Sequence, residues 1–256
     1  MSKDESRQDE YARQAEDLRG SVTIVTGASS GIGAAIAETF AEAGSRIVLV
    51  ARRQDRLREL EKRIRACGGE AVVQVADVSQ YSNISSVVNH AVELWGQVDI
   101  MINNAGNAVA KPLVESSIEE IDAQLDVNLR AVCYGCKAVL PRMLERRAGS
   151  IINIGSICSM RHFPDYATYV AAKFGVLGFS RSLYEEVRES GIRVNCLCPA
   201  AVNTEWAELA GADLPWEKHE RLQPRDLAHL ALLCCTVPKR VHLEHIVLWP
   251  TCEPTV

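Results

Sequence analysis

The sequence predicts an α/β protein with a doubly wound parallel sheet, that is, one sheet covered by helices on both faces. Short segments rich in β-branched residues alternate with longer segments of helical periodicity from Val22 to Trp249. Several short segments, such as VTIVT, RIVLV and SIINI, are almost entirely apolar, which is typical of parallel strands buried on both faces. Glycines follow the helical segments, where a left-handed helix end favours them; they are Gly44, Gly68, Gly69, Gly96, Gly149 and Gly191.

Seven short apolar or β-branched runs are the expected strands. In chain order they are Ser21–Thr26, Arg46–Val50, Ala71–Ala76, Val98–Asn103, Ser150–Gly155, Ile192–Leu197 and His245–Trp249. The segments between them carry apolar residues at helical spacing and are expected to be helices. These are Ile32–Ala43, Asp55–Ala66, Ile84–Trp95, Ile118–Arg147, Ala167–Glu189 and Arg225–Cys235.

Length and composition fit a single domain with a large core. The chain has 256 residues, of which 47% are hydrophobic. No linker, repeat or low-complexity block interrupts residues 21–256, so we expect these to form one domain. Residues 1–20 are a charged leader to which we assign no function.

Charge and cysteine usage exclude several classes of protein. The net charge of -5 lacks the basic footprint of a nucleic-acid-binding protein, and no apolar run is long enough to span a membrane. An odd count of nine cysteines argues against a disulfide framework, so a cytoplasmic protein is expected. Cys133 and Cys136 form a C-x-x-C pair, but no second Cys or His motif would complete a metal site. We interpret them as small buried side chains and expect no metal.

A glycine-rich turn joins the first strand to the first helix. Its sequence, TGASSGIG, contains Gly27, Ser29, Ser30, Gly31, Ile32 and Gly33. Such a turn lets the backbone approach a pyrophosphate at the positive end of a helix, so a dinucleotide is the expected ligand. The spacing G-x-x-x-G-x-G departs from the common G-x-G-x-x-G fingerprint, and tight packing is the alternative explanation.

Two arginines follow the second strand, where a NAD-selective site carries an Asp or Glu for the ribose hydroxyls. Arg52 and Arg53 would instead pair with a 2'-phosphate. NADP is therefore a better candidate than NAD. The alternative is that both arginines are the solvated start of a helix.

Four polar residues have a spacing that suggests proton chemistry. Tyr169 and Lys173 lie four residues apart and would share one helix face, where an ammonium favours the phenolate form of a tyrosine. Ser156 directly follows a strand, at the edge of the sheet where open α/β proteins bind ligands. Asn128 adds an amide to an apolar helical stretch, and a helix-surface amide is its alternative interpretation.

These motifs together resemble the compact branch of the short-chain dehydrogenase/reductase family. TGASSGIG is similar to its cofactor turn, Asp77 and Val78 to its adenine-contact pair, and NNAG, with Asn104, Ala105 and Gly106, to a further family motif. Asn128, Ser156, Tyr169 and Lys173 resemble its catalytic tetrad. The resemblance covers residues 20–235 and implies a Rossmann fold and an NADP(H)-dependent oxidoreductase that interconverts a carbonyl and an alcohol.

The resemblance also implies roles for these residues. Tyr169 would be the general acid/base, and Ser156 would hold the substrate oxygen. Lys173 would lower the pKa of the phenol and bind the nicotinamide ribose, and Asn128 would hold a water. Pro199, Val202 and Thr204 would border the nicotinamide. Here Ala200 replaces the glycine usual in the family, and it would be strained if its φ were positive.

Substrate choice and assembly are less constrained. Arg161 and His162 could receive a substrate carboxylate, or could be surface residues, and Trp206 and Trp216 could close an apolar lid or contact another subunit. The helical segments 118–147 and 167–189 resemble those that pair subunits in the family, which implies a homodimer or homotetramer. A catalytically silent NADP(H)-binding sensor is the alternative function. The complete tetrad argues against it, because a protein that only binds has no need of Tyr169 and Ser156 together.

Overall fold

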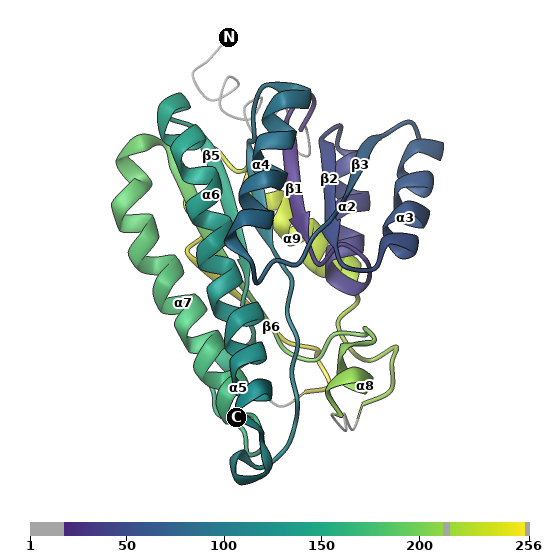
Figure 1. Ribbon diagram of the computed structural model, residues 1–256, viewed down its shortest axis with the longest axis vertical. Coiled ribbons are helices and arrows are strands. Elements are labelled where there is room, and N and C mark those ends of the chain that lie inside the picture. The colour runs from purple at the N-terminus through teal and green to yellow at the C-terminus, as the bar shows by residue number, and fades with distance from the viewer. Residues whose placement is uncertain (1–17, 212–215, 254–256) are drawn as a thin grey trace, which may run out of the picture.

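Seven parallel strands form one sheet in a computed structural model that describes residues 18–211 and 216–253 (Figure 1). The strand order is β3-β2-β1-β4-β5-β6-β7, and every neighbouring pair is parallel. The strands are β1 (Val22–Thr26), β2 (Arg46–Ala51), β3 (Glu70–Val75), β4 (Ile100–Asn103), β5 (Gly149–Ile154), β6 (Ile192–Pro199) and β7 (His245–Leu248). The predicted fold class and all seven predicted strands are confirmed. The order reverses between β1 and β4, which is where open sheets of this kind bind ligands.

Helices cover both faces of the sheet, giving three layers (Figure 1). One face carries α2 (Gly31–Glu42), α3 (Gln54–Ala66) and α9 (Pro224–Thr236). The other carries α4 (Tyr81–Trp95), α6 (Ala131–Arg146) and α7 (Ala167–Val187). Two shorter helices, α5 (Ile118–Leu125) and α8 (Trp206–Ala210), lie beyond the carboxyl edge of the sheet.

The strands contribute to a separate hydrophobic core on each side of the sheet. In β1, Val22 and Ile24 pack on the α4/α6/α7 side, whereas Val25 packs on the α2/α3/α9 side. This follows from the alternation of side chains along a strand. Because both faces are covered, the strands are apolar at nearly every position, as the sequence indicated.

The single helix predicted for residues 118–147 is wrong. A π-helical segment, η2 (Asp126–Arg130), separates α5 from α6. Within it, Asn128 Nδ2 donates to the carbonyl oxygen of Gln124 at 2.9 Å. A side-chain donor at the carbonyl four residues back competes with the backbone N–H and opens the turn, so the polar residue that looked out of place causes the break.

Two of the predicted helix-end glycines have a different role. Gly44, Gly68, Gly96 and Gly191 have positive φ, whereas Gly69 and Gly149 do not. After α6 the left-handed residue is Arg147, with φ 51°, and Gly149 already belongs to β5. A Cβ at Gly149 would lie 2.5 Å from the Met143 sulfur, so glycine is needed there for packing.

The described residues contain no helix both long and apolar enough to cross a bilayer. Most of the predicted leader, residues 1–17, lies outside the described ranges. Leu18 is buried in the core, and its backbone N–H donates to Ala43 O at 2.9 Å. The nine cysteines are all free thiols, and Cys136 of the C-x-x-C pair is fully buried, which raises its pKa.

Candidate active site

One groove crosses the carboxyl edge of the sheet, with a volume of about 980 Å³. Of the catalytic and cofactor-binding residues predicted from the sequence, only Gly33 is absent from its lining. The groove brings together the glycine-rich turn after β1, the residues after β2, β3 and β4, and the Ser156, Tyr169 and Lys173 group. We call it the carboxyl-edge groove. Its position at the β1/β4 switch point is the usual ligand position in this architecture.

The backbone of the glycine-rich turn lies very close to neighbouring atoms, which leaves no room for larger side chains at its glycines. Gly27 and Gly31 have positive φ of 66° and 55°. A Cβ on Gly33 would lie 2.5 Å from both Gly27 O and Asn104 Nδ2. Asn104 Nδ2 donates to Thr26 O at 2.9 Å, which ties the turn to the segment after β4. The packing explanation therefore holds for Gly33, while Gly27 and Gly31 line the groove.

Arg53 is the centre of a polar cluster at one end of the groove. Its Nε donates to Ser29 Oγ at 3.0 Å and its Nη2 to Ser30 Oγ at 2.6 Å. Its Nη1 pairs with Glu205 Oε1 at 2.6 Å. Arg53 is therefore held against the glycine-rich turn, and is more than the solvated start of a helix.

Arg52 lines the groove beside Asp77. The Ser79 backbone N–H donates to Asp77 Oδ1 at 3.0 Å and, with the nearby charge of Arg52, lowers the pKa of Asp77. Asp77 is thus an ionised acceptor at the groove wall. Val78 follows it in the same wall.

Tyr169 and Lys173 lie one turn apart on α7, both buried. Lys173 Nζ donates to Ile154 O at 2.8 Å and lies 5.5 Å from the centre of the Tyr169 ring. Ser156 follows β5, and its Oγ accepts a hydrogen bond from the Cys158 backbone N–H at 3.1 Å. The end of β5 therefore positions both the hydroxyl and the ammonium.

Burial has opposite effects on the two titratable groups. It raises the pKa of Tyr169 well above its usual value, and a hydrogen bond with Ser156 opposes this only in part. It lowers the pKa of Lys173 to about 8. Burial disfavours the charged form of each group. That Lys173 makes the phenol more acidic stays a prediction. The phenol is protonated at neutral pH.

Asn128 is fully buried, so the interpretation as a helix-surface amide is wrong. Besides its bond to Gln124 O, its Nδ2 donates to Asn107 O at 2.7 Å, and its Oδ1 accepts from the Asn107 backbone N–H at 3.3 Å. A Cβ on Gly106 would lie 2.8 Å from Asn128 Oδ1 and 3.8 Å from Lys173 Nζ. Asn128 therefore fixes the segment after β4 close to the Lys173 ammonium.

Aromatic and apolar side chains surround Tyr169. The ring of Trp206 lies 5.4 Å from the Tyr169 ring and that of Tyr166 lies 6.2 Å from it, measured between centroids. The groove is also lined here by Ala108, Val109, Cys158, Phe163, Leu209, Ala210 and Trp216. We call this part the apolar end of the groove.

Arg161 and His162 do not line the groove, so the structure gives no support to a carboxylate-binding role for them. The Arg161 guanidinium instead lies over the Trp249 ring, 4.6 Å from its centroid. From the C-terminal segment, Glu253 lines the groove, and its Oε2 accepts from the Ala201 backbone N–H at 3.4 Å. Burial raises the pKa of Glu253.

The segment after β6 forms the remaining wall of the groove. Pro199, Val202 and Thr204 line it as expected. Ala200 is not among the described non-glycine residues with positive φ, so alanine is accommodated there without strain.

Glu205 is the main polar residue that sequence reasoning missed. It precedes α8 and pairs with Arg56 as well as Arg53, with 2.6 Å between Oε2 and Arg56 Nη1. Hydrogen bonds from Arg56, Ser30 and Arg53 lower its pKa to about 2. No motif marks it, because its partners are about 150 residues away in sequence.

Comparison with known proteins agrees with this geometry. Residues 21–214 match the short chain dehydrogenase family. The chain belongs to this family. An uncharacterized oxidoreductase of Staphylococcus saprophyticus is 36% identical over 236 residues, which are 91% of this chain and 99% of that protein. This family membership identifies the chain as a short-chain dehydrogenase/reductase, that is, an oxidoreductase.

Two solved structures are also similar to this chain. An alcohol dehydrogenase from the archaeon Thermococcus sibiricus, complexed with 5-hydroxy-NADP, has a TM-score of 0.84 and 29% identity. A metagenomic short-chain oxidoreductase in complex with NADP has a TM-score of 0.81 and 33% identity. Each comparison covers 92% of this chain and 99% of the other.

Proposed function

We propose that this short-chain dehydrogenase/reductase uses NADP(H) to interconvert an uncharged, apolar ketone or aldehyde with its alcohol. The observation that carries the proposal is the composition of one continuous groove. Ser156, Tyr169 and Lys173 lie in it between an arginine-lined end and an apolar end.

The residues fit a phosphorylated dinucleotide. Gly27 and Gly31 would let the backbone approach the pyrophosphate at the start of α2. Arg52 and Arg53 would hold the 2'-phosphate, and Asp77 and Val78 would border the adenine. Asn104, Ala105, Gly106, Pro199, Val202 and Thr204 would line the path to the nicotinamide. Two similar structures, one complexed with 5-hydroxy-NADP and the other with NADP, support this choice.

The coenzyme would supply or accept the hydride, while the protein handles the proton. Because burial keeps the Tyr169 phenol protonated, it can donate its proton to the oxygen of a carbonyl as the hydride arrives. Ser156 would donate a hydrogen bond to the same oxygen. The Lys173 ammonium would then stabilise the phenolate, and a water held near Asn128 would resupply the proton.

The apolar end favours a substrate without charge. The side chains that form the apolar end are aromatic, aliphatic or small. The nearby charge contributed by the C-terminal segment is the carboxylate of Glu253, which would repel a substrate carboxylate. An aryl or alkyl ketone therefore fits better than an oxo acid.

Tyr169→Phe tests the mechanism. We expect it to abolish NADPH oxidation over a panel of ketones and aldehydes while NADPH binding, followed by fluorescence, survives. Tyr134→Phe is the matched control, because Tyr134 packs on Tyr81 on the outer helical layer, with 5.6 Å between the ring centroids. Full activity of Tyr169→Phe would exclude it as the acid. Tight NADPH binding by the unmodified protein with no turnover on any carbonyl would favour the sensor.

Paired substrates test the apolar end. An aryl ketone and the oxo acid carrying the same ring differ mainly in the carboxylate. We expect kcat/KM for the ketone to be roughly tenfold higher or more, since an unpaired charge in an apolar site is costly. Preference for the oxo acid would contradict the assignment.

Exposed apolar residues support a proposal of self-association. Phe174 on α7 and Leu144 on α6 are 45% and 42% exposed. A homodimer or homotetramer would cover them, and light scattering after size-exclusion chromatography measures the mass directly. A monomer at micromolar concentration would contradict this.

A further inference from the structure

A second pocket lies at the amino edge of the sheet, opposite the carboxyl-edge groove. Its volume is about 510 Å³, which is within the usual range for small-molecule sites. Its walls come from the residues just before or at the start of β1, β4, β5 and β6, and from the loop between α9 and β7. It shares no lining residue with the carboxyl-edge groove. We call it the basal pocket.

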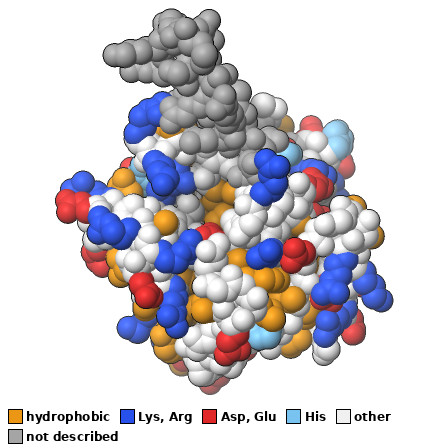
Figure 2. Space-filling view, turned by 90° about the horizontal axis from the view of Figure 1, so that it is seen from above, with side chains coloured by type: hydrophobic (Ala, Val, Ile, Leu, Met, Phe, Trp, Pro, Cys, Tyr) orange, Lys and Arg blue, Asp and Glu red, His pale blue; other side chains and the backbone are white. Residues whose placement is uncertain are grey.

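The basal pocket is lined by basic side chains, although the chain as a whole has a net charge of -5. Figure 2 looks onto the end of the molecule that is uppermost in Figure 1 and shows Lys and Arg side chains spread over it, interspersed with Asp and Glu side chains. The basic residues lining the pocket are Arg19, Arg147, Arg188, Arg193, Lys239 and Arg240. Asp99 is its one carboxylate among the described lining residues.

Asp99 is already engaged by other groups. Its Oδ1 pairs with Arg146 Nη2 at 2.6 Å, and its Oδ2 accepts from the Val22 N–H and from Gln97 Nε2, both at 2.8 Å. Because Arg146 does not line the pocket, the Asp99 charge is balanced from outside it. The Asp99 carboxylate therefore contributes little to neutralising the pocket. Arg188, in contrast, is paired with Glu185 at 3.0 Å and with Glu189 at 3.7 Å, so its own charge is largely balanced.

Two arginines in the pocket are held by uncharged partners. Arg193 donates to the carbonyl oxygens of Cys235 and Val237, at 2.6 Å and 2.9 Å. Arg147 donates to the carbonyl oxygen of Glu189 at 2.6 Å. These bonds fix the guanidinium groups and leave their charges in place. Fixed donors of this kind suit the oxygens of a phosphate group.

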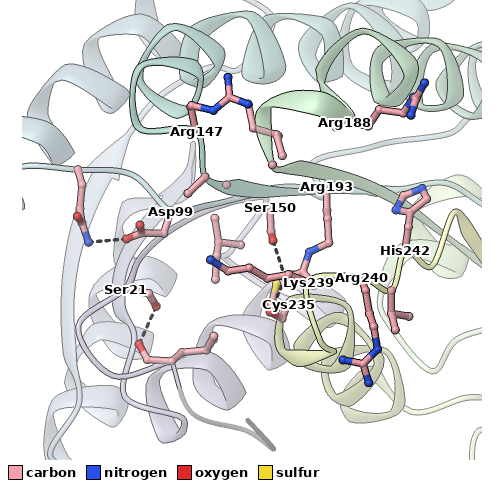
Figure 3. Close-up of a pocket in the computed structure, with 18 of the residues that line it drawn as sticks. Ser21, Asp99, Arg147, Ser150, Arg188, Arg193, Cys235, Lys239, Arg240 and His242 are labelled. Carbon is pink, nitrogen blue, oxygen red and sulfur yellow. Dashed lines mark hydrogen bonds between the residues drawn. The ribbon is translucent and has the colours of Figure 1, made fainter. Parts of the chain in front are cut away.

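Lys239 extends across the middle of the pocket, near Arg193 (Figure 3). Within residues 18–211 and 216–253, no carboxylate lies within ion-pair distance of its ammonium. The stacked rings of Tyr184 and His242, 3.5 Å apart, form part of the wall. The pocket thus combines a central lysine, fixed arginines and a flat aromatic wall.

We propose that the basal pocket is a second binding site, which takes a small polyanion carrying two or more linked phosphate groups, as in a nucleoside polyphosphate. Concentrated positive charge in a concave site attracts a multiply charged anion more strongly than a single charge. The aromatic wall provides a surface for the organic part of such a ligand. This site is separate from coenzyme binding in the carboxyl-edge groove.

Isothermal titration with inorganic tripolyphosphate and with ATP tests the proposal, because the first probe carries phosphates alone. We expect binding of both, weakening with salt as an electrostatic site requires. Lys239→Ala should weaken tripolyphosphate binding roughly tenfold, since hydrogen bonds to charged groups are strong. Lys239→Glu should abolish it.

Two matched variants locate the binding. Arg142→Ala removes an arginine on the outer face of α6, where it pairs with Glu145 at 3.8 Å, and should leave binding unchanged. Arg52→Ala removes a basic group from the carboxyl-edge groove and, in titrations made with saturating NADPH so that this groove is already filled, should also leave tripolyphosphate binding unchanged. Thermal unfolding of each variant checks that it is folded.

The opposite pattern would overturn the proposal. If Arg52→Ala abolished binding and Lys239→Glu did not, the polyphosphate would bind in the carboxyl-edge groove. Absence of any heat or thermal shift at millimolar tripolyphosphate would mean that the basal pocket is not a phosphate site. Either result leaves the proposed carbonyl chemistry untouched, because that rests on Tyr169 and its neighbours.

Discussion

The Glu205 carboxylate forms an ion pair with Arg53 at 2.6 Å, directly over the glycine-rich turn. Arg53 is simultaneously bonded to Ser29 and Ser30 of that turn. Glu205 immediately precedes α8, which carries Trp206 and Leu209 of the apolar end. One carboxylate therefore links the proposed phosphate-binding end of the groove to the proposed substrate-binding end.

Glu205→Gln should strengthen NADPH binding. The carboxylate partly neutralises Arg53, so a neutral amide leaves more positive charge for the 2'-phosphate. Because exposed ion pairs contribute about 1 kcal/mol or less, the Kd for NADPH should fall by roughly fivefold at most. Fluorescence titration of NADPH and NADH measures this, and the Kd for NADH should barely change.

Glu208→Gln is the matched control for this prediction. Glu208 lies on α8, three residues after Glu205, but pairs with Lys218 at 3.0 Å, and neither Glu208 nor Lys218 lines the groove. Weaker NADPH binding by Glu205→Gln alone would show that the carboxylate holds the groove in its binding shape. That result would contradict the charge argument.

Arg52→Asp should reverse the coenzyme preference. The change removes a phosphate partner and puts a carboxylate near Asp77, so a 2'-phosphate is repelled while ribose hydroxyls gain an acceptor. We expect the ratio of kcat/KM for NADPH to that for NADH to fall by roughly 100-fold. Steady-state kinetics with both coenzymes checks this. An unchanged ratio would assign the preference to Arg53 alone.

The low pKa of Lys173 predicts an alkaline limit to carbonyl reduction. Burial favours the neutral amine, so the ammonium is present below about pH 8 and is lost above it. The phenolate that forms on Tyr169 then loses its stabilising charge. We expect kcat/KM for reduction, which reports free-enzyme ionisations, to fall as pH rises through this value.

Lys173→Arg tests whether the loss of activity at high pH comes from deprotonation of Lys173 or of another group. A guanidinium stays charged throughout the accessible pH range, so the limit should move upward by more than one pH unit even if the maximal rate is lower. If the limit stayed near its original pH in Lys173→Arg, another group would be responsible.

The sheet was predictable from the sequence because the signals that mark each strand lie within a few consecutive residues. Each strand is a short apolar run, and each run is bounded by residues that end a helix or turn the chain. Gly149 shows where this reasoning stopped. Its position after a helix suggested a left-handed cap, but the structure needs glycine there because Met143 packs against it. Packing between distant atoms leaves no pattern in the local sequence.

The site residues that form motifs over a short stretch of sequence were predictable. Those that meet only through contacts between distant parts of the chain were missed. Tyr169 and Lys173 are four residues apart, so helix geometry alone places them together. Glu205 and Arg53 meet only because α8 folds back over the glycine-rich turn. The raised pKa of Tyr169 was not predictable either, because it comes mainly from burial, which depends on the surroundings in three dimensions.

Asn128→Ala should be strongly destabilising. The amide is completely buried and bonds Gln124 O, Asn107 O and the Asn107 N–H, so its removal leaves these groups without partners in the interior. Unpartnered buried groups cost about 1–3 kcal/mol each, and partial relaxation should bring the total loss of unfolding free energy to about 3 kcal/mol. Urea unfolding measures the loss.

Asn89→Ala is the control, because Asn89 is an exposed asparagine within α4 and should change the unfolding free energy by less than about 0.5 kcal/mol. Asn128→Asp keeps an acceptor for the Asn107 N–H but loses both donors, so it should be destabilised about as much as Asn128→Ala. A nearly neutral Asn128→Ala would mean that water replaces the amide, and that the π-helical segment does not depend on this side chain.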